Sequence, residues 1–464
     1  MTSSADTPAG VVALHLHAPP GGWTSAASPR EPDAVVRGTR ASLGLPPSRP
    51  LIMTGHQAGL WHAGILAKYL AADALASSIA GAAWSHLVVD QDINDAGALP
   101  APTADLRRVT LRLAPPWPGR VTSRQPASTR AGEIAPGMHP EVVARVERIM
   151  AMVSTTASAP DLPSQLETMV RTLTSPLFSL PRGVRATGLA STDGFRVLLR
   201  AMRDDPVACV EHYNAAAAST PRARLAPLRT RGGGRELPLW RIDPAAGTRH
   251  AVFSDEVSDV PPELLAPRAL LLSAFLRLFV CDLFIHGTGG GLYDQATDAW
   301  LGRWQPSWKP CPGAVVSATV TLPLAAEGAW PSPEAIARAR WEAHAARHDP
   351  ERLGDARAAA ASEALLARIR EAKAAGADAR GAYLELHALL EGVRSRHRAA
   401  LETLDAKATA LEAAGQASRV VHDRTWPFAL HSEATLLALR ASIRRAIAAT
   451  DGGVRSAARA DRRA

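Results

Sequence analysis

The chain has few cysteines, few aromatic residues and no long uninterrupted apolar run. Its three cysteines are far apart, and no Cys-x-x-Cys pair occurs, which argues against a disulfide framework and a structural zinc site. They are Cys209, Cys281 and Cys311. The most apolar window, 269–285, includes Arg277 and Asp282 and is shorter than the roughly 20 apolar residues of a membrane span. Residues 1–10 lack the features of a secretory signal. We therefore expect a cytoplasmic protein that does not contact a membrane.

The charge of the chain is basic but dispersed. Its 464 residues carry a net charge of +8, and 47% of them are hydrophobic, enough for a sizeable core. The excess is mostly arginine and is densest at 455–463. A basic balance is compatible with a phosphate-bearing ligand. No aromatic-interleaved basic patch or zinc-finger spacing occurs, which disfavours nucleic acid as a partner.

The most informative segment is the glycine-rich stretch 54–64, between a short apolar run at 51–53 and an expected helix at 65–79. A strand, a glycine turn and a helix start form a place where α/β enzymes bind phosphate or carboxylate, through free backbone N–H groups. The histidines His56 and His62 can carry protons. The candidate binding residues of this turn are Thr54, Gly55, Gln57, Gly59 and Gly64, and His56 is a candidate catalytic residue. A turn whose glycines serve only backbone geometry is the alternative.

Two further polar segments follow expected strands. Asp90-x-Asp92-x-Asn94 comes after the apolar run 86–89, and His286 opens a second glycine turn after 283–285. Ligands bind outside the carboxyl ends of parallel strands, so we expect these loops to share a site with the first turn. The candidates are Asp90 and His286 as catalytic residues, and Asp92, Asn94, Gly287, Gly289, Gly290, Tyr293 and Asp294 as binding residues. The alternatives are a helix-capping Asx-rich loop and an ordinary glycine turn. No metal ligand set is predicted.

The rest of the chain suggests a discontinuous core. We expect residues 1–114 to form the first part of an α/β, Rossmann-like parallel-sheet core, 115–260 an inserted mixed region, and 261–332 the second part of the core. Apolar residues at steps of three and four between Tyr383 and Leu411 predict an antiparallel helical coiled-coil hairpin over 333–415, with a turn near Gly376. Residues 416–464 would return to the core, with a strand at 419–422 and a helix at 432–449.

The order of these motifs resembles the bacillithiol biosynthesis cysteine-adding enzymes. The turn 54–60 is similar to their TGQQxGL motif, Val89-Asp90-Gln91-Asp92 stands where they have an acidic segment, and 286–290 corresponds to a GGPGE-like turn. The chain departs from the family at His56, at Gln91 and in the late turn, which lacks the proline and glutamate. The similarity follows most of the chain in order, but the matched motifs cover few residues.

The resemblance implies a ligase-like enzyme that joins cysteine to the amine of glucosaminyl-malate, a nucleotide-binding core and a homodimer formed through the helical segment. We therefore expect a C–N bond-forming ligase that acts on an amino acid and an amino sugar. ATP or ADP would be its nucleotide, and the sequence leaves Mg²⁺ open. The alternatives are a nucleotidyl transferase-like enzyme and a non-catalytic nucleotide-binding scaffold.

Overall fold

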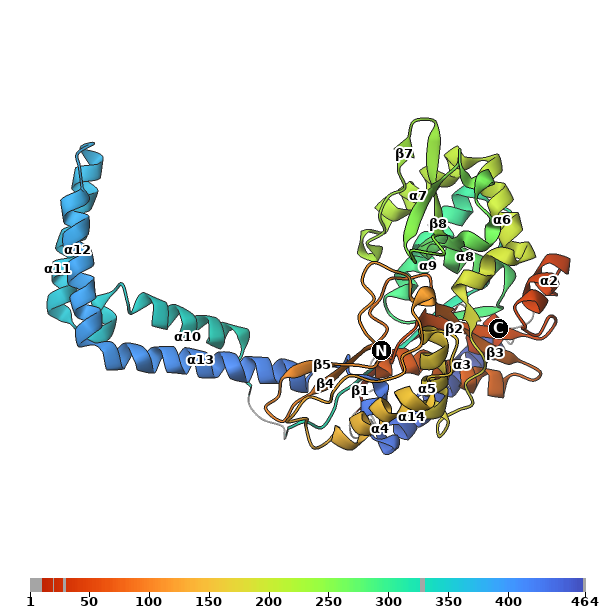
Figure 1. Ribbon diagram of the computed structural model, residues 1–464, viewed down its shortest axis with the longest axis horizontal. Coiled ribbons are helices and arrows are strands. Elements are labelled where there is room, and N and C mark those ends of the chain that lie inside the picture. Colours follow the sequence, from red (N-terminus) through yellow and green to blue (C-terminus); the bar gives the residue numbers. More distant parts are fainter. Residues whose placement is uncertain (1–10, 20, 28–30, 326–329, 462–464) are drawn as a thin grey trace. The chain divides into compact units, whose positions relative to one another are not determined.

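The chain forms two compact units in a computed structural model, which describes residues 11–19, 21–27, 31–325 and 330–461 (Figure 1). The larger unit contains residues 1–104, 108–322 and 423–464, and the smaller contains 105–107 and 323–422. The expectations for residues 1–10 and for the arginine side chains at 455–463 lie outside the described parts of the chain.

A six-stranded sheet forms the centre of the larger unit. Its strands, in spatial order, are β1 (Val11–His17), β12 (Gly313–Val320), β11 (Leu283–His286), β2 (Leu51–Gln57), β3 (Ala83–Val89) and β6 (Val184–Arg185). All neighbouring pairs are parallel except β1 with β12. Numbered along the chain, the five parallel strands lie in the order 3-2-1-4-5, compatible with a Rossmann-like α/β fold. In that order the connections diverge between β2 and β11, where a crevice opens at the carboxyl ends of the strands.

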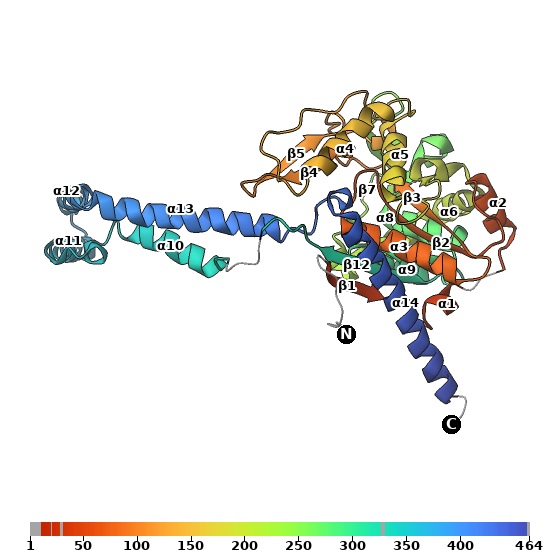
Figure 2. The ribbon, with the colours of Figure 1, turned by 90° about the horizontal axis from the view of Figure 1, so that it is seen from below.

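Helices cover both faces of this sheet, which explains why its strands are apolar without alternation. Ile52 packs on the face covered by α3 (Ala63–Ser78) and α14 (Glu433–Asp461), and Figure 2 shows these two helices side by side. Its neighbours Leu51 and Met53 pack on the opposite face with α8 (Ala269–Phe279) and α9 (Gly290–Trp304). The expected strand–helix–strand unit is therefore present.

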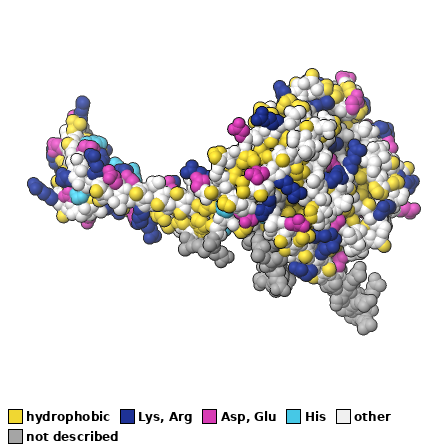
Figure 3. All heavy atoms as spheres, turned by 60° about the horizontal axis from the view of Figure 1, so that its bottom comes forward, with side chains coloured by type: hydrophobic (Ala, Val, Ile, Leu, Met, Phe, Trp, Pro, Cys, Tyr) yellow, Lys and Arg dark blue, Asp and Glu magenta, His cyan; other side chains and the backbone are white. Residues whose placement is uncertain are grey.

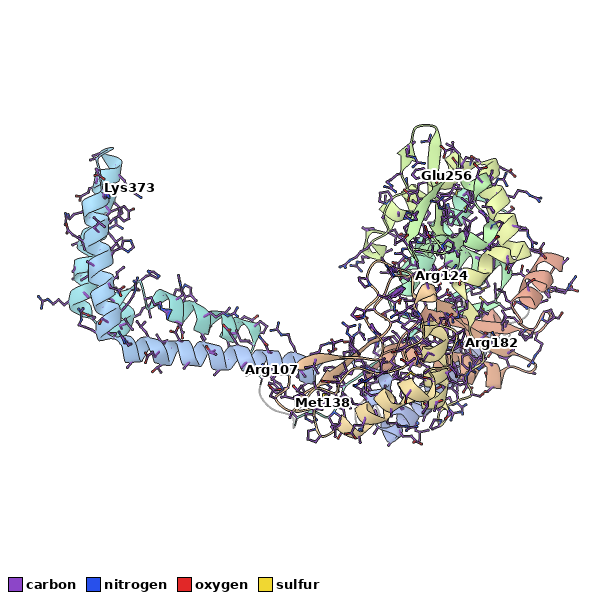
Figure 4. The ribbon with its side chains drawn as sticks, viewed as in Figure 1. Arg107, Arg124, Met138, Arg182, Glu256 and Lys373 are labelled. Atoms are coloured by element: carbon purple, nitrogen blue, oxygen red, sulfur yellow. The ribbon has the colours of Figure 1, made fainter. Side chains whose placement is uncertain are left out.

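The inserted region, 115–260, contains both helices and strands. Its helices are α4 (Val143–Thr155), α5 (Leu162–Thr174), α6 (Asp193–Asp204) and α7 (Pro206–Ser219). A small antiparallel sheet contains β7 (Thr230–Arg231), β8 (Gly234–Ile242) and β9 (Arg249–Phe253) of this region, and β10 (Leu265–Pro267), which follows it. Before the region, β4 (Ala98–Pro102) pairs separately with β5 (Arg108–Arg112). The remaining helices of the larger unit are α1 (Trp23–Ala26) and α2 (Ala34–Ser42). Glu256 lies beside β7, where it pairs with Arg231 at 3.3 Å (Figure 4).

The smaller unit contains the helices α10 (Pro333–Ala345), α11 (Ala356–Ala374), α12 (Arg380–Arg396) and α13 (Arg398–Val421). The apolar seam predicted between Tyr383 and Leu411 divides at His397, which stands between α12 and α13. Before the break, Leu386 and Leu390 pack against Ile369 of α11. After it, Ala408 packs against α10 instead. Lys373 lies near the Gly376 turn that joins α11 to α12 (Figure 4).

The strand predicted at 419–422 is wrong. Helix α13 continues to Val421 because no glycine or proline interrupts it after Gly415, and the β-branched pair Val420-Val421 does not outweigh that continuity. The closing helix predicted at 432–449 is present as α14 and is longer than expected. Among the described residues, no helix has the length and apolar character that crossing a membrane requires.

Candidate functional site

A cavity of about 600 Å³ opens at the carboxyl ends of β2, β3 and β11, where the order of the sheet changes direction. All three predicted polar loops contribute to its lining. The predicted residues that line it are Gly55, His56, Gln57, Gly64, Asp92, His286, Gly287, Gly289, Gly290 and Tyr293. The tertiary structure therefore gathers most of the candidate residues in one place, because adjacent parallel strands end at the same edge.

The first turn is tightly built around its glycines. His62 caps α3, with its Nδ1 accepting a hydrogen bond from the backbone N–H of Gly64 at 3.1 Å. A Cβ atom on Gly64 would lie 2.6 Å from the carbonyl oxygen of Ala318, so only glycine fits there. Because Nδ1 of His62 accepts the bond from Gly64, the imidazole ring is neutral and its Nδ1 is unprotonated.

Three nitrogen bases share this wall of the cavity. Lys68, one turn into α3, donates from Nζ to the carbonyl oxygen of Gly55, and burial lowers its pKa to about 7. Burial, Lys68 and His62 lower the pKa of His56, and burial, Arg424 and Lys68 bring the pKa of His62 to about 4. The two histidines are therefore neutral at pH 7, and the amine of Lys68 is partly deprotonated.

Lys68 was not predicted as a site residue from its sequence position. The available signal was a single lysine in an otherwise apolar and small run, Ile65 to Ala72. A lysine on a buried helix face carries a desolvation cost, so such an isolated residue can indicate a functional amine.

The two aspartates of the acidic segment, Asp90 and Asp92, have different roles. Asp92 lines the cavity, where it accepts hydrogen bonds from Gln57 Nε2 and from Arg249 Nη1, both at 2.9 Å. Burial opposes its ionisation, but these bonds and the charge of Arg249 outweigh burial and lower the pKa of Asp92. Asp92 is therefore a fixed carboxylate that holds the inserted region against the end of β3.

Asp90, predicted to be catalytic, does not line the cavity. It is 1% exposed, and its carboxylate accepts bonds from the backbone N–H and hydroxyl of Thr187 at 2.9 and 2.7 Å. Burial raises its pKa. Asp90 lies just after the last residue of β3, where strand alternation no longer predicts the direction of a side chain. Its contacts give it a structural role.

Three other predicted binding residues do not line the large cavity, and two of them hold the turns in place. The hydroxyl of Thr54 donates to the carbonyl of Ile285 at 2.8 Å, and Asn94 Nδ2 donates to the carbonyl of Ala58 at 2.9 Å. Gly59 is also outside the lining of the large cavity.

The third loop is organised around His286. Its Nε2 lies 2.9 Å from Oδ1 of Asp294, and Arg277 Nη1 lies 3.2 Å from the same oxygen. Asp294 is behind the lining, and a Cβ on Gly290 would lie 2.4 Å from His286 Nδ1. Nε2 of His286 is therefore directed at Asp294, and Nδ1 lies beside Gly290, which also lines the cavity.

The small antiparallel sheet contributes a wall that the sequence did not indicate. The guanidinium groups of Arg249 and Arg268 lie 4.6 and 4.1 Å from the ring of Trp240, and all three residues line the cavity. Arg268 also pairs with the buried carboxylate of Glu236. Trp240 lies on β8, Arg249 on β9 and Arg268 directly after β10, so the pairing of these three consecutive strands brings the side chains together.

The lining is strongly basic. It contains Lys68 and four arginines but one carboxylate, that of Asp92. The arginines are Arg224, Arg249, Arg268 and Arg424. Arginine and the N–H groups at the start of α9 both favour phosphate or carboxylate oxygens. Figure 3 shows Lys and Arg dispersed over the face in view rather than gathered in one patch.

The lining is rich in groups that bind anionic oxygens. Among the described residues, no group of three histidine, cysteine, aspartate or glutamate side chains is placed to hold a metal. The arginines and the free N–H groups of the glycine turn fit phosphate oxygens.

No protein-family model matches this chain, and no curated protein sequence matches it. The residues of the cavity therefore provide the basis for its function.

Proposed function

We propose that the protein is a cysteine-ligase-like enzyme that joins the carboxyl group of an amino acid to the amine of an amino sugar. Cysteine and glucosaminyl-malate are the substrates suggested by the resemblance of the three loops. The observation that carries the proposal is the pairing of two walls. Neutral His56 and His62, with the partly deprotonated Lys68, line a cavity that also presents arginines and a glycine turn.

Amide formation needs both walls. The carboxylate must first be activated, either as an acyl phosphate with release of ADP or as an acyl adenylate with release of pyrophosphate. The amine nitrogen then attacks the acyl carbon, and the C–O bond to phosphate or AMP breaks with its electron pair leaving on oxygen. The attacking amine must lose protons, which is the work of a neutral base such as His56. The arginines and N–H groups stabilise the charge on the phosphate and on the acyl oxygen.

ATP is the nucleotide that these activation steps consume, and ADP would be bound as a product of the acyl-phosphate route. Residues Gly287–Gly290 at the start of α9, with Arg224 and Arg424, would hold its phosphates. The bound nucleotide supplies a leaving group for the carboxylate. Any Mg²⁺ would enter with those phosphates, with Asp92 as the carboxylate at hand in the lining.

The test supplies the purified protein with ATP, cysteine and glucosaminyl-malate, and follows the thiol product by mass spectrometry. ADP and pyrophosphate are measured in parallel to identify the activation step. We expect His56→Gln to lower the rate by roughly 100-fold or more, in line with the loss of a general base. His344→Gln, an exposed histidine of the smaller unit, is the matched control and should leave the rate unchanged. Equal rates for the His56 variant and the wild type would refute the assigned role.

Nucleotidyl transfer is the second candidate. Trp240 and Tyr213 line the same cavity as the glycine turn, and aromatic rings beside a phosphate site favour a nucleoside. This activity would release pyrophosphate from ATP and an acid without any amine. Tight nucleotide binding with no turnover of any substrate would instead indicate a non-catalytic scaffold.

We also propose that the helical segment 333–415 pairs with a second copy to form a homodimer. Trp341 and Leu384 are 54% and 63% exposed on α10 and α12, and large exposed apolar side chains favour association. Light scattering of the wild type and of a Leu384→Glu variant tests this, and a monomeric wild type would refute it.

A further inference from the structure

A second, much smaller cavity lies next to the first, between the carboxyl ends of β2 and β3 and helix α5. Its volume is about 10 Å³. A cavity of that size has room for about one water molecule, provided that polar groups are present to bind it.

The lining supplies such polar groups. His86 of β3 is 1% exposed, and within the described residues neither of its ring nitrogens has a hydrogen-bond partner. Leaving a buried polar group unpaired costs about 1–3 kcal/mol. A bound molecule that forms hydrogen bonds with His86 would remove this cost. His56 and Glu167 complete the polar lining with Gln57.

His56 lines both cavities. It is therefore placed between the large cavity and the small one. Burial, together with Arg171 and Lys68, lowers the pKa of His86 to about 3, and the pKa of His56 is also lowered. Both rings are neutral, so each has one nitrogen that donates and one that accepts.

Glu167 lines the small cavity and is also partly exposed to solvent. Its Oε1 accepts hydrogen bonds from the backbone N–H of Gly183 at 2.7 Å and from Arg171 Nη2 at 2.8 Å. The Glu167 side chain is 13% exposed, whereas His86 is almost fully enclosed. A proton that reaches this carboxylate can leave to bulk water.

We infer that the small cavity binds one water molecule, hydrogen-bonded to His56 and His86, and that this water is the outlet for protons taken up by His56. The water site stands on the cavity alone, and only the direction of proton flow rests on the proposed function. A proton leaves the substrate amine for the nitrogen of His56 on the large-cavity side. The N–H on the opposite side of the ring gives its proton to the water, which passes one to Glu167. No electrons are transferred, and the imidazole ends as the other neutral tautomer.

The water site is tested by a crystal structure at a resolution that shows enclosed waters, for the wild type, His86→Leu and His431→Leu. His431 is the matched control, because it is a buried histidine whose Nε2 has no partner among the described residues but which lines neither cavity. We expect density within hydrogen-bond distance of His56 and His86 in the wild type and in the control, and none in His86→Leu. A dry cavity in the wild type would overturn the inference, even if His86→Leu fails to fold.

The outlet is tested without any substrate by NMR of ¹⁵N-labelled histidine, which reports how fast the ring N–H of His56 exchanges with solvent. Exchange should slow by roughly tenfold or more in His86→Leu and Glu167→Gln, because the relay is interrupted, and should not change in His431→Leu. An unchanged exchange rate of the His56 ring N–H in Glu167→Gln would overturn the proposed route for proton release. Both readouts are independent of ligase activity, so failure of the proposed function leaves them intact.

Discussion

Replacing Lys68 with methionine should stabilise the larger unit at neutral pH while removing an amine from the cavity wall. The Lys68 pKa falls from 10.5 to about 7 on folding because of burial. A difference of about 3.5 units corresponds to about 5 kcal/mol, which the native state loses by keeping this amine buried. Methionine keeps the apolar stem but leaves the carbonyl of Gly55 without its hydrogen-bond donor. This loss costs about 1–3 kcal/mol and offsets part of the gain from removing the buried amine. The expected net gain is about 2–4 kcal/mol below pH 7.

The pH dependence identifies the cause. Between about pH 7 and 10.5 the unfolded chain binds a proton at Lys68 that the native state does not, so wild-type stability rises with pH. The advantage of Lys68→Met should be complete below pH 7 and shrink by about 1.4 kcal/mol per pH unit above it. Urea unfolding followed by fluorescence of the eleven tryptophans measures this difference from pH 6 to 10. Lys309→Met, at an exposed lysine, is the control for the loss of a surface charge and should change the free energy of unfolding by less than about 0.5 kcal/mol. A Lys68→Met advantage that is absent, or that does not change with pH, would show that this amine is not buried at a cost.

Two further predictions concern other parts of the larger unit. Asp282→Asn should lower the free energy of unfolding by roughly 3–5 kcal/mol in urea titrations, because it leaves buried Arg40 without its 2.9 Å carboxylate partner; a change below about 1 kcal/mol would contradict this. Gly290→Ala should weaken ATP binding by roughly tenfold in tryptophan fluorescence titrations, since its methyl group would displace His286 from the glycine turn. Gly302→Ala, in the same helix with open space around it, should bind ATP as the wild type does, and equal affinity for both variants would count against the glycine turn as the phosphate site.

Local patterns were sufficient to predict the sheet edge and its loops. The apolar run at 51–53, the glycines after it and the acidic segment after 86–89 each follow from short-range physics, because strands buried on both faces are continuously apolar and glycine marks tight turns. The same reasoning failed at Val420-Val421, where two β-branched residues suggested a strand but helix continuity decided. It also failed at Asp90, because the direction of the Asp90 side chain depends on Thr187, almost 100 residues further along the chain.

The sequence by itself determined the type of core, the positions of its three polar loops and their meeting at one edge of a parallel sheet. Only the tertiary structure decided which of those side chains enter the cavity. Asp92 enters and Asp90 does not, His286 turns toward Asp294, and the basic wall around Trp240 comes from the inserted sheet. The physical reason is the range of the interactions: turns and strands depend on neighbouring residues, whereas burial, pKa and side-chain direction depend on partners that folding brings from distant parts of the chain.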